Sequence, residues 1–288
     1  MKTRATKADK LLIISSGAAR VDDAVQARLR AEFPDHVVVD FDPSRDYEKL
    51  MTPRARVVVA GGDGTVEHVA RKLADTKHAL GMIPLGTFNN FALALHVPAD
   101  LDKAIDVVKK GRARAITVGR VNNKVFLEAC AVGLFGDAIV LGDSAKDLHF
   151  GDVVARLREV IAAKPFEYEL AGDLQGSGSA MSLVFANTSS IGSQLPVGAA
   201  KPIHPYLELS VDAGRSHADI VARMLASALL AKHEEEAAHT FRFKKLSVKT
   251  RPRVRVYADN QPAGRTPAEV RAEVSALRVI LPVGGDNK

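Results

Sequence analysis

Apolar residues in the first 120 positions follow two patterns that alternate along the chain. Short apolar or β-branched runs predict strands at Leu11–Ser15, His36–Phe41, Arg56–Ala60 and Leu80–Pro84. Between these runs, apolar residues three and four positions apart predict helices at Val21–Glu32, Val66–Ala74, Asn90–Leu95 and Leu101–Lys110. Strands that alternate with helices of this length indicate βαβ units, so we expect a mostly parallel sheet.

Strand-like segments dominate after about residue 117, and residues typical of turns separate them. The expected strands are Ala115–Val121, Val125–Ala131, Glu167–Leu170, Met181–Asn187, Tyr206–Val211, Thr240–Val248, Arg253–Tyr257 and Ala276–Leu281. Two helices are expected in this part, at Phe150–Ala163 and His217–His233. We therefore expect an α/β domain at residues 1–118 and a β-rich, sandwich-like domain at residues 119–288, and we allow for a last strand that returns to the first domain.

The overall composition indicates a globular protein, because 47% of the 288 residues are hydrophobic and 26% are charged. No apolar stretch approaches the roughly 18 residues of a transmembrane helix. The run Leu11–Ile14 is too short for a signal peptide. The single cysteine, Cys130, excludes intrachain disulfides and cysteine-rich metal sites, and its apolar setting predicts a small core residue. These features predict a cytoplasmic protein.

Basic residues are in excess, with 40 Lys and Arg against 34 Asp and Glu and a formal charge of +6. The excess fits either ordinary solubility or an anionic partner. Side chains that stack on bases are scarce, since Trp is absent and 5% of residues are aromatic, so we expect no nucleic-acid partner. Arg251, Arg253 and Arg255 alternate with other residues and would share one strand face. That face is either solvated or a contact for an anionic membrane.

A first candidate site is the segment Gly61–Thr65, which follows the apolar run Arg56–Ala60 and precedes a predicted helix. Its three glycines let the backbone approach a ligand, and the helix that follows would offer N–H groups to an anion. Thr65 would cap the helix or bond a phosphate oxygen. Asp63 would repel phosphates unless Mg²⁺ or a ribose hydroxyl lay between them. The alternative is a tight strand-to-helix turn with no ligand.

A second candidate site is the segment Pro84–Ala92, which also follows a predicted strand and precedes a helix. Thr87 and Asn89 could form hydrogen bonds to a ligand, and Gly86 permits close approach. Ligands of open α/β sheets bind beyond the carboxyl ends of the strands. The two segments together therefore predict a nucleotide-binding cleft.

The order GGDGT (61–65) and then PLGTFNNFA (84–92) resembles the diacylglycerol kinase catalytic domain of bacterial lipid kinases, eukaryotic diacylglycerol kinases and sphingosine kinases. Phe126–Asp137 and Val256–Pro282 resemble later parts of the same family. The resemblance implies a phosphofructokinase-like α/β domain, a β-sandwich domain and ATP bound between them. NAD kinases share GGDGT, but the second motif and the chain's ending favour the lipid kinases.

The resemblance also implies the residues of a nucleotide site. Ser16 and Gly17 match the end of the family's Asn-Pro-x-Ser-Gly motif, although Ile13 and Ile14 replace its first two residues. The implied nucleotide-binding residues are Ser16, Gly17, Gly61, Gly62, Asp63, Gly64, Thr65, Val66, Glu67, Gly86, Thr87 and Asn89. The implied cofactors are ATP and the Mg²⁺ that accompanies it.

Three departures from the family bear on catalysis. His68, beside Glu67, stands where the family often has Glu. Pro202–Tyr206 replaces an acidic loop that binds a structural Mg²⁺ in bacterial members, so we expect no such metal. The family's Asp-Gly-Glu is Asp259-Asn260-Gln261 here, and a Gln amide cannot accept the proton that the family's Glu accepts. Asp259 is then either the catalytic base or a hairpin-turn residue.

We therefore expect an ATP-dependent lipid kinase that phosphorylates a hydroxyl of a diacylglycerol-like or long-chain lipid, with Asp259 as the candidate base. Positioning and charge neutralisation supply most of the rate in phosphoryl transfer, so a kinase without the Glu could remain active. The alternative is a catalytically impaired protein of the same fold that binds nucleotide or lipid. The lipid species and the oligomeric state are not indicated by the sequence.

Overall fold

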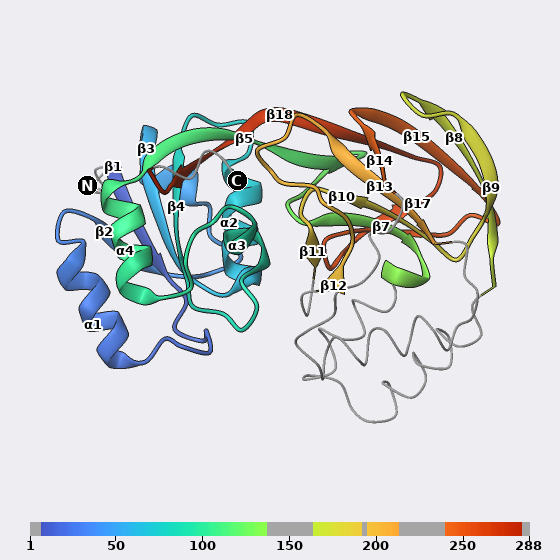
Figure 1. The fold of residues 1–288 in the computed structure, drawn as a ribbon. Helices are drawn as coiled ribbons and strands as arrows, with labels where there is room; N and C mark the ends of the chain where they lie inside the picture. Colours follow the sequence, from blue (N-terminus) through green and yellow to red (C-terminus); the bar gives the residue numbers. More distant parts are fainter. Residues whose placement is uncertain (1–6, 137–163, 192–194, 213–239, 284–288) are drawn as a thin grey trace. The chain divides into compact units, whose positions relative to one another are not determined.

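The computed structural model describes residues 7–136, 164–191, 195–212 and 240–283 (Figure 1). The helices expected at Phe150–Ala163 and His217–His233 lie outside the described residues. The chain forms two compact units. The first contains the chain up to Ile116 together with the residues from Ser275 onward, and the second contains Thr117–Val274. The last strand of the chain therefore begins in the second unit and ends in the first.

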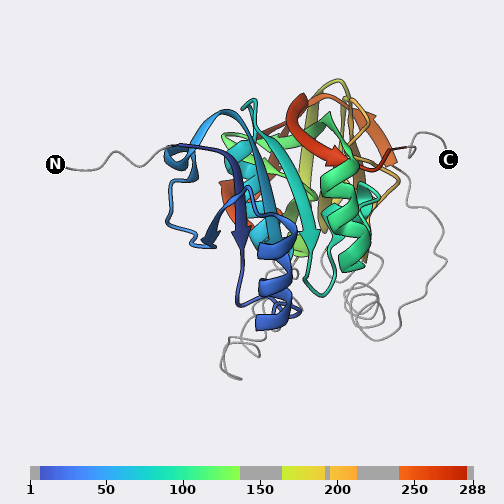
Figure 2. The same ribbon diagram turned by 90° about the vertical axis from the view of Figure 1, so that its left-hand side faces the viewer.

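Five parallel strands form the sheet of the first unit, in the order β2-β1-β3-β4-β18. The strands are β1 (Ala8–Ile14), β2 (Val37–Asp40), β3 (Met51–Gly61), β4 (Ala79–Pro84) and the end of β18 (Ala268–Leu281). The helices are α1 (Asp23–Glu32), α2 (Asp63–Leu73), α3 (Asn90–Ala94), α4 (Leu101–Lys110) and the 3-10 turn η1 (Tyr47–Leu50). Helices α1 and α4 cover one face of this sheet and α2 covers the other (Figure 1), and α1 and α4 lie in front of the strands in Figure 2. The expected mostly parallel α/β arrangement is confirmed.

Local sequence explains where the two helices of one face begin. The carboxylate of Asp22 accepts the N–H of Val25 at 2.8 Å at the start of α1, and that of Asp100 accepts the N–H of Lys103 at 2.9 Å at the start of α4. Both helices then pack apolar side chains against the sheet. The buried cluster that results contains Leu12, Ile14, Leu29, Val58, Ile83, Ala104, Ile105 and Val108, among others.

The parallel register brings three loops to one edge of this sheet. Ile14 of β1 is paired with Ala60 of β3, and Gly61 of β3 is paired with Pro84 of β4. The three strands therefore end within one or two residues of one another. The loops after β1, β3 and β4 begin at this carboxyl edge, which is where open α/β sheets bind ligands.

The second unit consists of two antiparallel layers. One sheet has the order β14-β13-β10-β7-β16-β17, and the other contains the start of β18 with β15, β8, β9, β5 and β6. These strands are β5 (Arg112–Val121), β6 (Lys124–Phe126), β7 (Ala129–Gly133), β8 (Phe166–Gly172), β9 (Gly176–Ala180), β10 (Ser182–Ala186), β13 (Leu207–Asp212), β14 (Thr240–Phe243), β15 (Lys245–Arg251), β16 (Arg255–Ala258) and β17 (Gln261–Arg265). A short pair, β11 (Ser190–Ile191) and β12 (Leu195–Pro196), lies outside both sheets.

An apolar core from both layers fills the second unit. Its fully buried members include Phe126, Cys130, Phe185, Leu246 and Val270. Phe185 also meets Phe243 edge to face, with ring centroids 5.7 Å apart. The expected β-sandwich is confirmed, and Cys130 is the core residue that its apolar setting predicts. None of the helices in the described part of the chain is long and apolar enough to cross a membrane.

Two elements differ from the sequence-based expectation. Helix α2 begins at Asp63 and not at Val66, because Gly62 takes the extended N-cap conformation and the motif itself becomes the first helical turn. The strand expected at Thr240–Val248 is two strands, β14 and β15, which belong to different sheets. A run of alternating residues does not reveal such a change of sheet, since the alternation continues through it.

Candidate functional site

The loop after β3 turns directly into helix α2, so the GGDGT motif is a helix start. Gly62 is the N-cap, and its carbonyl oxygen accepts the N–H groups of Thr65 at 3.1 Å and Val66 at 3.0 Å. Gly64 is exposed, and no described atom lies within 4 Å of the position that a Cβ would take there. The N-terminal N–H groups and the dipole of α2 make this turn a suitable site for an anion.

The loop after β4 lies directly against this helix start. A Cβ built on Gly86 would lie 2.6 Å from the Cα of Gly62, closer than real Cβ atoms approach another atom. A Cβ built on Gly61 would lie 3.0 Å from the Cβ atoms of both Ser15 and Thr65. The close backbone approach therefore requires glycine at 86 and leaves little room at 61. The segments Gly61–Thr65 and Pro84–Ala92 are thus packed against each other, and we call the two together the loop platform.

Asn89 holds the loop after β4 in shape. Its Oδ1 accepts the N–H of Gly86 and its Nδ2 donates to the carbonyl oxygen of Gly86, both at 2.9 Å. Its φ of 55° lies in the left-handed region, which Asn tolerates better than most residues. Asn89 is only 4% exposed and shapes the loop, and the direct contact with nucleotide that the sequence suggested stays a prediction.

Asp63 ties the two motifs together. Its Oδ2 accepts the N–H of Asn89 at 2.8 Å, so a carboxylate of the first helix turn holds the N-cap residue of α3. Charged acceptors at such positions form strong hydrogen bonds. One carboxylate oxygen of the GGDGT motif therefore connects the two loops, which the sequence did not indicate.

Arg20 is a positioning residue that the sequence analysis missed. Its guanidinium donates to the carbonyl oxygens of Pro84 at 2.8 Å and Ala99 at 3.2 Å, and its N–H donates to Leu85 at 3.3 Å. It thereby fastens the loop after β1 to the loop after β4. A lone Arg shortly after Ser16-Gly17 was the only available signal.

The other predicted nucleotide residues fall into two groups. Ser16, Gly17 and Thr87 are exposed at the same sheet edge, where a ligand could reach them. Thr65, Val66 and Glu67 are buried, and Glu67 faces Arg71 one turn further along α2 at 2.7 Å. These three side chains therefore serve the packing of α2. Their backbone belongs to the helix start, but their side chains do not face outward from it.

His68 occupies the family's Glu position on α2. Its ring meets that of Phe41 edge to face, with centroids 5.4 Å apart. Burial lowers the pKa of His68, and the nearby Lys72 and Arg71 lower it further, whereas a hydrogen bond with the backbone of Pro43 opposes the shift. A neutral imidazole here cannot replace the charge of a carboxylate.

The second unit holds Asp259 at the turn between β16 and β17. Its Oδ1 accepts the N–H of Glu128 at 2.9 Å and those of Leu127 and Ala129 at 3.2 Å, and its Oδ2 accepts the N–H of Leu127 at 3.1 Å. Its own N–H donates to the carbonyl oxygen of Ala129 at 2.8 Å. With φ at 52°, Asp259 occupies a two-residue hairpin turn with Asn260. These contacts favour the turn interpretation over the base.

Asp259 also affects the thiol of Cys130 on β7. Burial raises the pKa of Cys130 well above its usual value, and the negative charge of Asp259 raises it further. The thiol therefore stays protonated and unreactive near neutral pH. Gln261, the residue at the family's Glu position, is exposed at the start of β17.

The loop at Pro202–Tyr206 is organised by stacking. The rings of His204 and Tyr206 are stacked with centroids 4.9 Å apart, and the guanidinium of Arg242 lies 4.7 Å from the centre of Tyr206. Burial lowers the pKa of His204, and nearby Lys201 lowers it further. Among the described residues, no group of three or more His, Cys, Asp or Glu could hold a metal ion.

The arrangement expected for three arginines is wrong. Arg251 ends β15 in one sheet, Arg253 lies between strands, and Arg255 begins β16 in the other sheet. They therefore share no strand face. Arg251 is also paired in register with Glu167 of β8. The three arginines were expected on one face because they alternate with other residues. The chain leaves one sheet after Arg251 and enters the other at Arg255, so that alternation does not continue along one strand.

The outer face of β18 and its neighbours is balanced in charge. Arg271 bonds Glu273 at 2.5 Å and Glu269 at 3.1 Å, Lys245 lies 3.1 Å from Glu269, and Arg120 lies 3.2 Å from Glu273. The side-chain hydrogen bond from Arg271 lowers the pKa of Glu273, against the effect of burial. This face carries no uniform positive charge.

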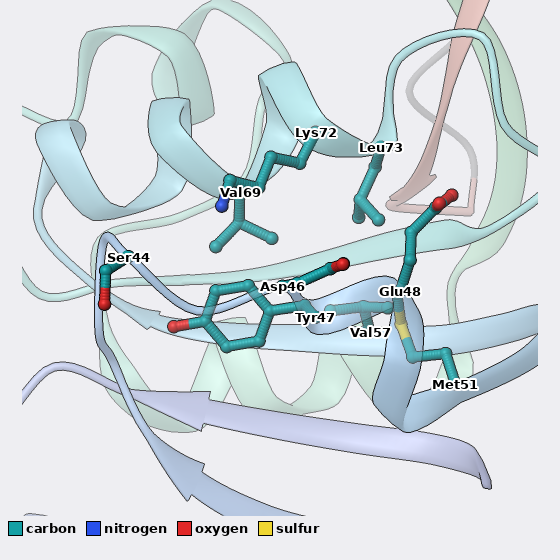
Figure 3. Close-up of a pocket in the computed structure, with 9 residues that line it drawn as sticks. All are labelled: Ser44, Asp46, Tyr47, Glu48, Met51, Val57, Val69, Lys72 and Leu73. Atoms are coloured by element: carbon teal, nitrogen blue, oxygen red, sulfur yellow. The ribbon is translucent and has the colours of Figure 1, made fainter.

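One pocket of about 260 Å³ lies beside α2 (Figure 3). Tyr47, Met51 and Val57 line it together with Val69 and Lys72 of α2. Lys72 donates to a backbone carbonyl and lies 5.7 Å from the ring centre of Tyr47. None of the predicted nucleotide residues lines this pocket, so it is separate from the loop platform.

Comparison with known proteins finds a family model that matches part of the chain. Residues 15–121 match the model of the diacylglycerol kinase catalytic domain. A diacylglycerol kinase of Staphylococcus carnosus is 39% identical over 90 residues, which is 31% of this chain and 27% of that protein. One of Staphylococcus aureus strain JH9 is 37% identical over 95 residues, 32% of this chain and 30% of that protein. The matched segments span less than a third of these curated relatives.

Solved structures extend the likeness to the whole fold. A diacylglycerol kinase from Bacillus anthracis has a TM-score of 0.73 at 22% identity, covering 95% of this chain and 97% of that one. An NAD kinase from Archaeoglobus fulgidus in complex with ATP has a TM-score of 0.54 at 15% identity, covering 94% and 92%. The two-unit architecture is thus shared, and residues 15–121 match the diacylglycerol kinase catalytic-domain family.

Proposed function

We propose that this protein is an ATP-dependent lipid kinase that transfers the γ-phosphate to a hydroxyl of a diacylglycerol-like or long-chain lipid alcohol. The observation that carries the proposal is the platform of Gly62, Gly64 and Gly86, in which a helix start and a second loop lie in van der Waals contact. The loops are held by Asp63 and Asn89. The platform offers backbone donors and open space, which phosphates require.

ATP is the proposed phosphate donor. The NAD kinase with a similar fold is described as a complex with ATP, and phosphoryl transfer proceeds mainly by positioning and neutralising charge. Mg²⁺ would enter with the nucleotide, since the described residues contain no cluster that could hold a resident ion. Asp63, in the first turn of α2, is the carboxylate that could face such an ion, although its Oδ2 already accepts an N–H.

A lipid alcohol is the proposed acceptor, because the curated relatives are named diacylglycerol kinases. A reaction of this kind would serve lipid metabolism such as phospholipid biosynthesis, in the cytoplasm and at a membrane surface. Peripheral contact with an anionic membrane is part of the proposal, although Arg251, Arg253 and Arg255 do not form the single strand face that was expected to make this contact. The second candidate is a protein that binds nucleotide or lipid without turnover, which Gln261 in place of Glu favours.

Nucleotide binding is the first test, with Gly64→Ala as the probe. Its Cβ would meet no described atom within 4 Å, so the fold should be unaffected while the methyl group intrudes on a bound phosphate. ATP·Mg²⁺ at about 100 times its Kd should stabilise the wild type by about 2.7 kcal/mol in thermal unfolding, and the variant by much less. A wild-type melting temperature that does not respond to ATP would overturn the proposal.

Turnover separates the two candidate functions. Labelled phosphate from ATP should appear in lipid when the wild type is supplied with a panel of lipid alcohols in mixed micelles. Gly64→Ala is the matched control in the same assay. Nucleotide binding without incorporation into any lipid would favour the binding protein over the kinase.

A further inference from the structure

The three loops at the carboxyl edge of the first unit carry few charges. These loops are the segments 15–20, 61–65 and 84–92, at the ends of β1, β3 and β4. Asp63 is their one acidic residue and Arg20 is their one basic residue. A nucleotide would bring several negative charges to this edge, whereas the start of α2 offers about half of a positive charge. Arg20 is therefore the full positive charge that these loops can offer to phosphates.

Arg20 lies next to the glycines of the loop platform. Its backbone N–H donates to the carbonyl oxygen of Leu85 at 3.3 Å, and the N–H of Leu85 donates to the carbonyl oxygen of Gly61 at 2.8 Å. Leu85 directly precedes Gly86, which packs against Gly62. The backbone of Arg20 is thus two hydrogen bonds away from the start of the GGDGT motif.

The guanidinium of Arg20 is held by neutral groups. Its Nη2 donates to the carbonyl oxygen of Pro84 at 2.8 Å, and its Nη1 donates to that of Ala99 at 3.2 Å. Asp100 follows Ala99, but its Oδ1 accepts the N–H of Lys103 at 2.9 Å and caps α4. Within the part of the chain that the structure describes, Arg20 has no ion-pair partner. The protein therefore orients this charge without neutralising it.

Arg28 on α1 has the opposite kind of partners. It is exposed, as Arg20 is, and it also joins distant segments of the first unit. It donates to Glu32 of its own helix at 3.0 Å and to Asp102 of α4 at 2.8 Å. Both partners are carboxylates, so they compensate the charge of Arg28. The carbonyl partners of Arg20 instead leave its charge available to an anion.

The chemistry of this side chain suits phosphates. Arginine stays charged in proteins, and its planar fork of N–H groups matches the oxygens of a phosphate. A guanidinium has more N–H groups than the carbonyl oxygens of Pro84 and Ala99 use. Ser16 and Gly17, in the same loop as Arg20, are exposed. A ligand at this loop could therefore meet both backbone and cation.

We propose that Arg20 is a cation of the nucleotide site and that its guanidinium binds the phosphates of ATP. This inference rests on the proposed lipid kinase activity, because that activity requires the nucleotide. The carbonyl oxygens of Pro84 and Ala99 already hold the guanidinium at the edge of the sheet, so little side-chain freedom is lost when a phosphate binds. The positive charge offsets part of the negative charge of the phosphates.

Titration calorimetry with ATP·Mg²⁺ tests the role of this charge. Arg20→Gln should raise the Kd for ATP by roughly 10- to 100-fold, because a hydrogen bond between charged groups is lost. Raising KCl from about 0.05 M to about 0.5 M should weaken ATP binding more in the wild type than in Arg20→Gln, since salt screens a charge that the variant lacks. Arg20→Lys keeps the charge, so it should keep the salt dependence and part of the affinity.

Arg28→Gln is the matched control. It removes one exposed positive charge and its hydrogen bonds, as Arg20→Gln does, but from a site where carboxylates compensate the charge. It should leave the Kd for ATP unchanged, and urea unfolding checks that each variant is folded. If Arg20→Gln does not fold, Arg20→Lys takes its place, and a lysine variant whose ATP affinity no longer depends on salt would overturn the proposal.

Three results with folded variants would also overturn the role of Arg20. They are an Arg20→Gln variant that binds ATP as tightly as the wild type, one that binds weakly with the salt dependence of the wild type, and an equal loss of affinity in Arg28→Gln. A wild type that does not bind ATP would instead overturn the proposed function itself, so the two failures are distinguishable.

Discussion

The loops that meet at the sheet edge of the first unit and the hairpin turn at Asp259 in the second unit use polar side chains in the same way, but with different results. Asn89 and Asp259 have φ angles of 55° and 52°, and each accepts N–H groups from a nearby backbone segment. In the first unit this leaves glycine backbone facing open space. In the second unit it fixes the backbone of Leu127–Ala129 beside a hairpin turn. A conspicuous polar residue in a motif can thus serve to hold the backbone.

The sheets account for the difference. Parallel strands end together at one edge, so successive loops meet there and their backbone can be packed closely. An antiparallel sheet is closed by hairpin turns, and a turn residue can reach only the strand beside it. Loops that meet and offer backbone to a ligand are therefore natural to the first unit, and a strand end fixed by a turn residue is natural to the second.

The largest effect is expected from Gly86→Ala in the first unit. Its Cβ would lie 2.6 Å from the Cα of Gly62, and backbone cannot yield as a flexible side chain would. We expect a loss of about 3 kcal/mol in the free energy of unfolding, measured with urea, and loss of the ATP thermal shift. Gly64→Ala is the control that should leave stability near that of the wild type. Equal stability of the two variants would show that the loops are not in contact.

A smaller effect is expected from Asp259→Ala in the second unit. The change leaves the N–H groups of Leu127, Glu128 and Ala129 without this acceptor and should cost about 2 kcal/mol in urea unfolding. Asp259→Asn keeps one acceptor oxygen and tolerates the positive φ, so it should retain most of the stability and of the activity. If Asp259→Asn is fully stable but inactive, Asp259 is the base and the comparison between the units is broken.

The smallest effect is expected from removing the side chain of Asn89. Asn89→Gly loses the two hydrogen bonds to Gly86 but accepts the φ of 55°, and should cost about 1 kcal/mol in urea unfolding. Asn89→Ala should cost about 1 kcal/mol more, because alanine is strained in the left-handed region. The KM for ATP should rise in both. Identical stabilities of the Gly and Ala variants would show that the backbone at position 89 relaxes.

Several features followed from the sequence because they depend on near neighbours in the chain. The alternation of short apolar runs with helical periodicity predicted the parallel unit. The strand predicted at Leu80–Pro84 agrees with β4 to within one residue, whereas the strand predicted at Leu11–Ser15 misses the start of β1 at Ala8. The three glycines of Gly61–Thr65 indicated close backbone approach, and that approach is present between Gly62 and Gly86. The prediction that Cys130 is buried rested on its apolar neighbours alone.

The features that were predicted wrongly or not at all depend on segments that lie far apart in the chain or in different sheets. Arg251, Arg253 and Arg255 alternate perfectly in the sequence, yet the chain changes sheet between the first and the last of them. Arg20 carries no local signal, because its partners Pro84 and Ala99 lie more than 60 residues away along the chain. Helix α2 begins inside the glycine motif, at Asp63, with an N-cap residue, Gly62, that lies against Gly86 of a distant loop.

The sequence by itself determined the fold class, the two kinds of sheet and the loops that bear the candidate nucleotide site, since periodicity and glycine placement are local properties of the chain. Only the tertiary structure decided which polar groups are used to hold backbone. Asp63 reaches Asn89, and Asp259 reaches Glu128, across 26 and 131 positions. Such hydrogen bonds form between segments that the fold brings together, so no pattern within either segment records them.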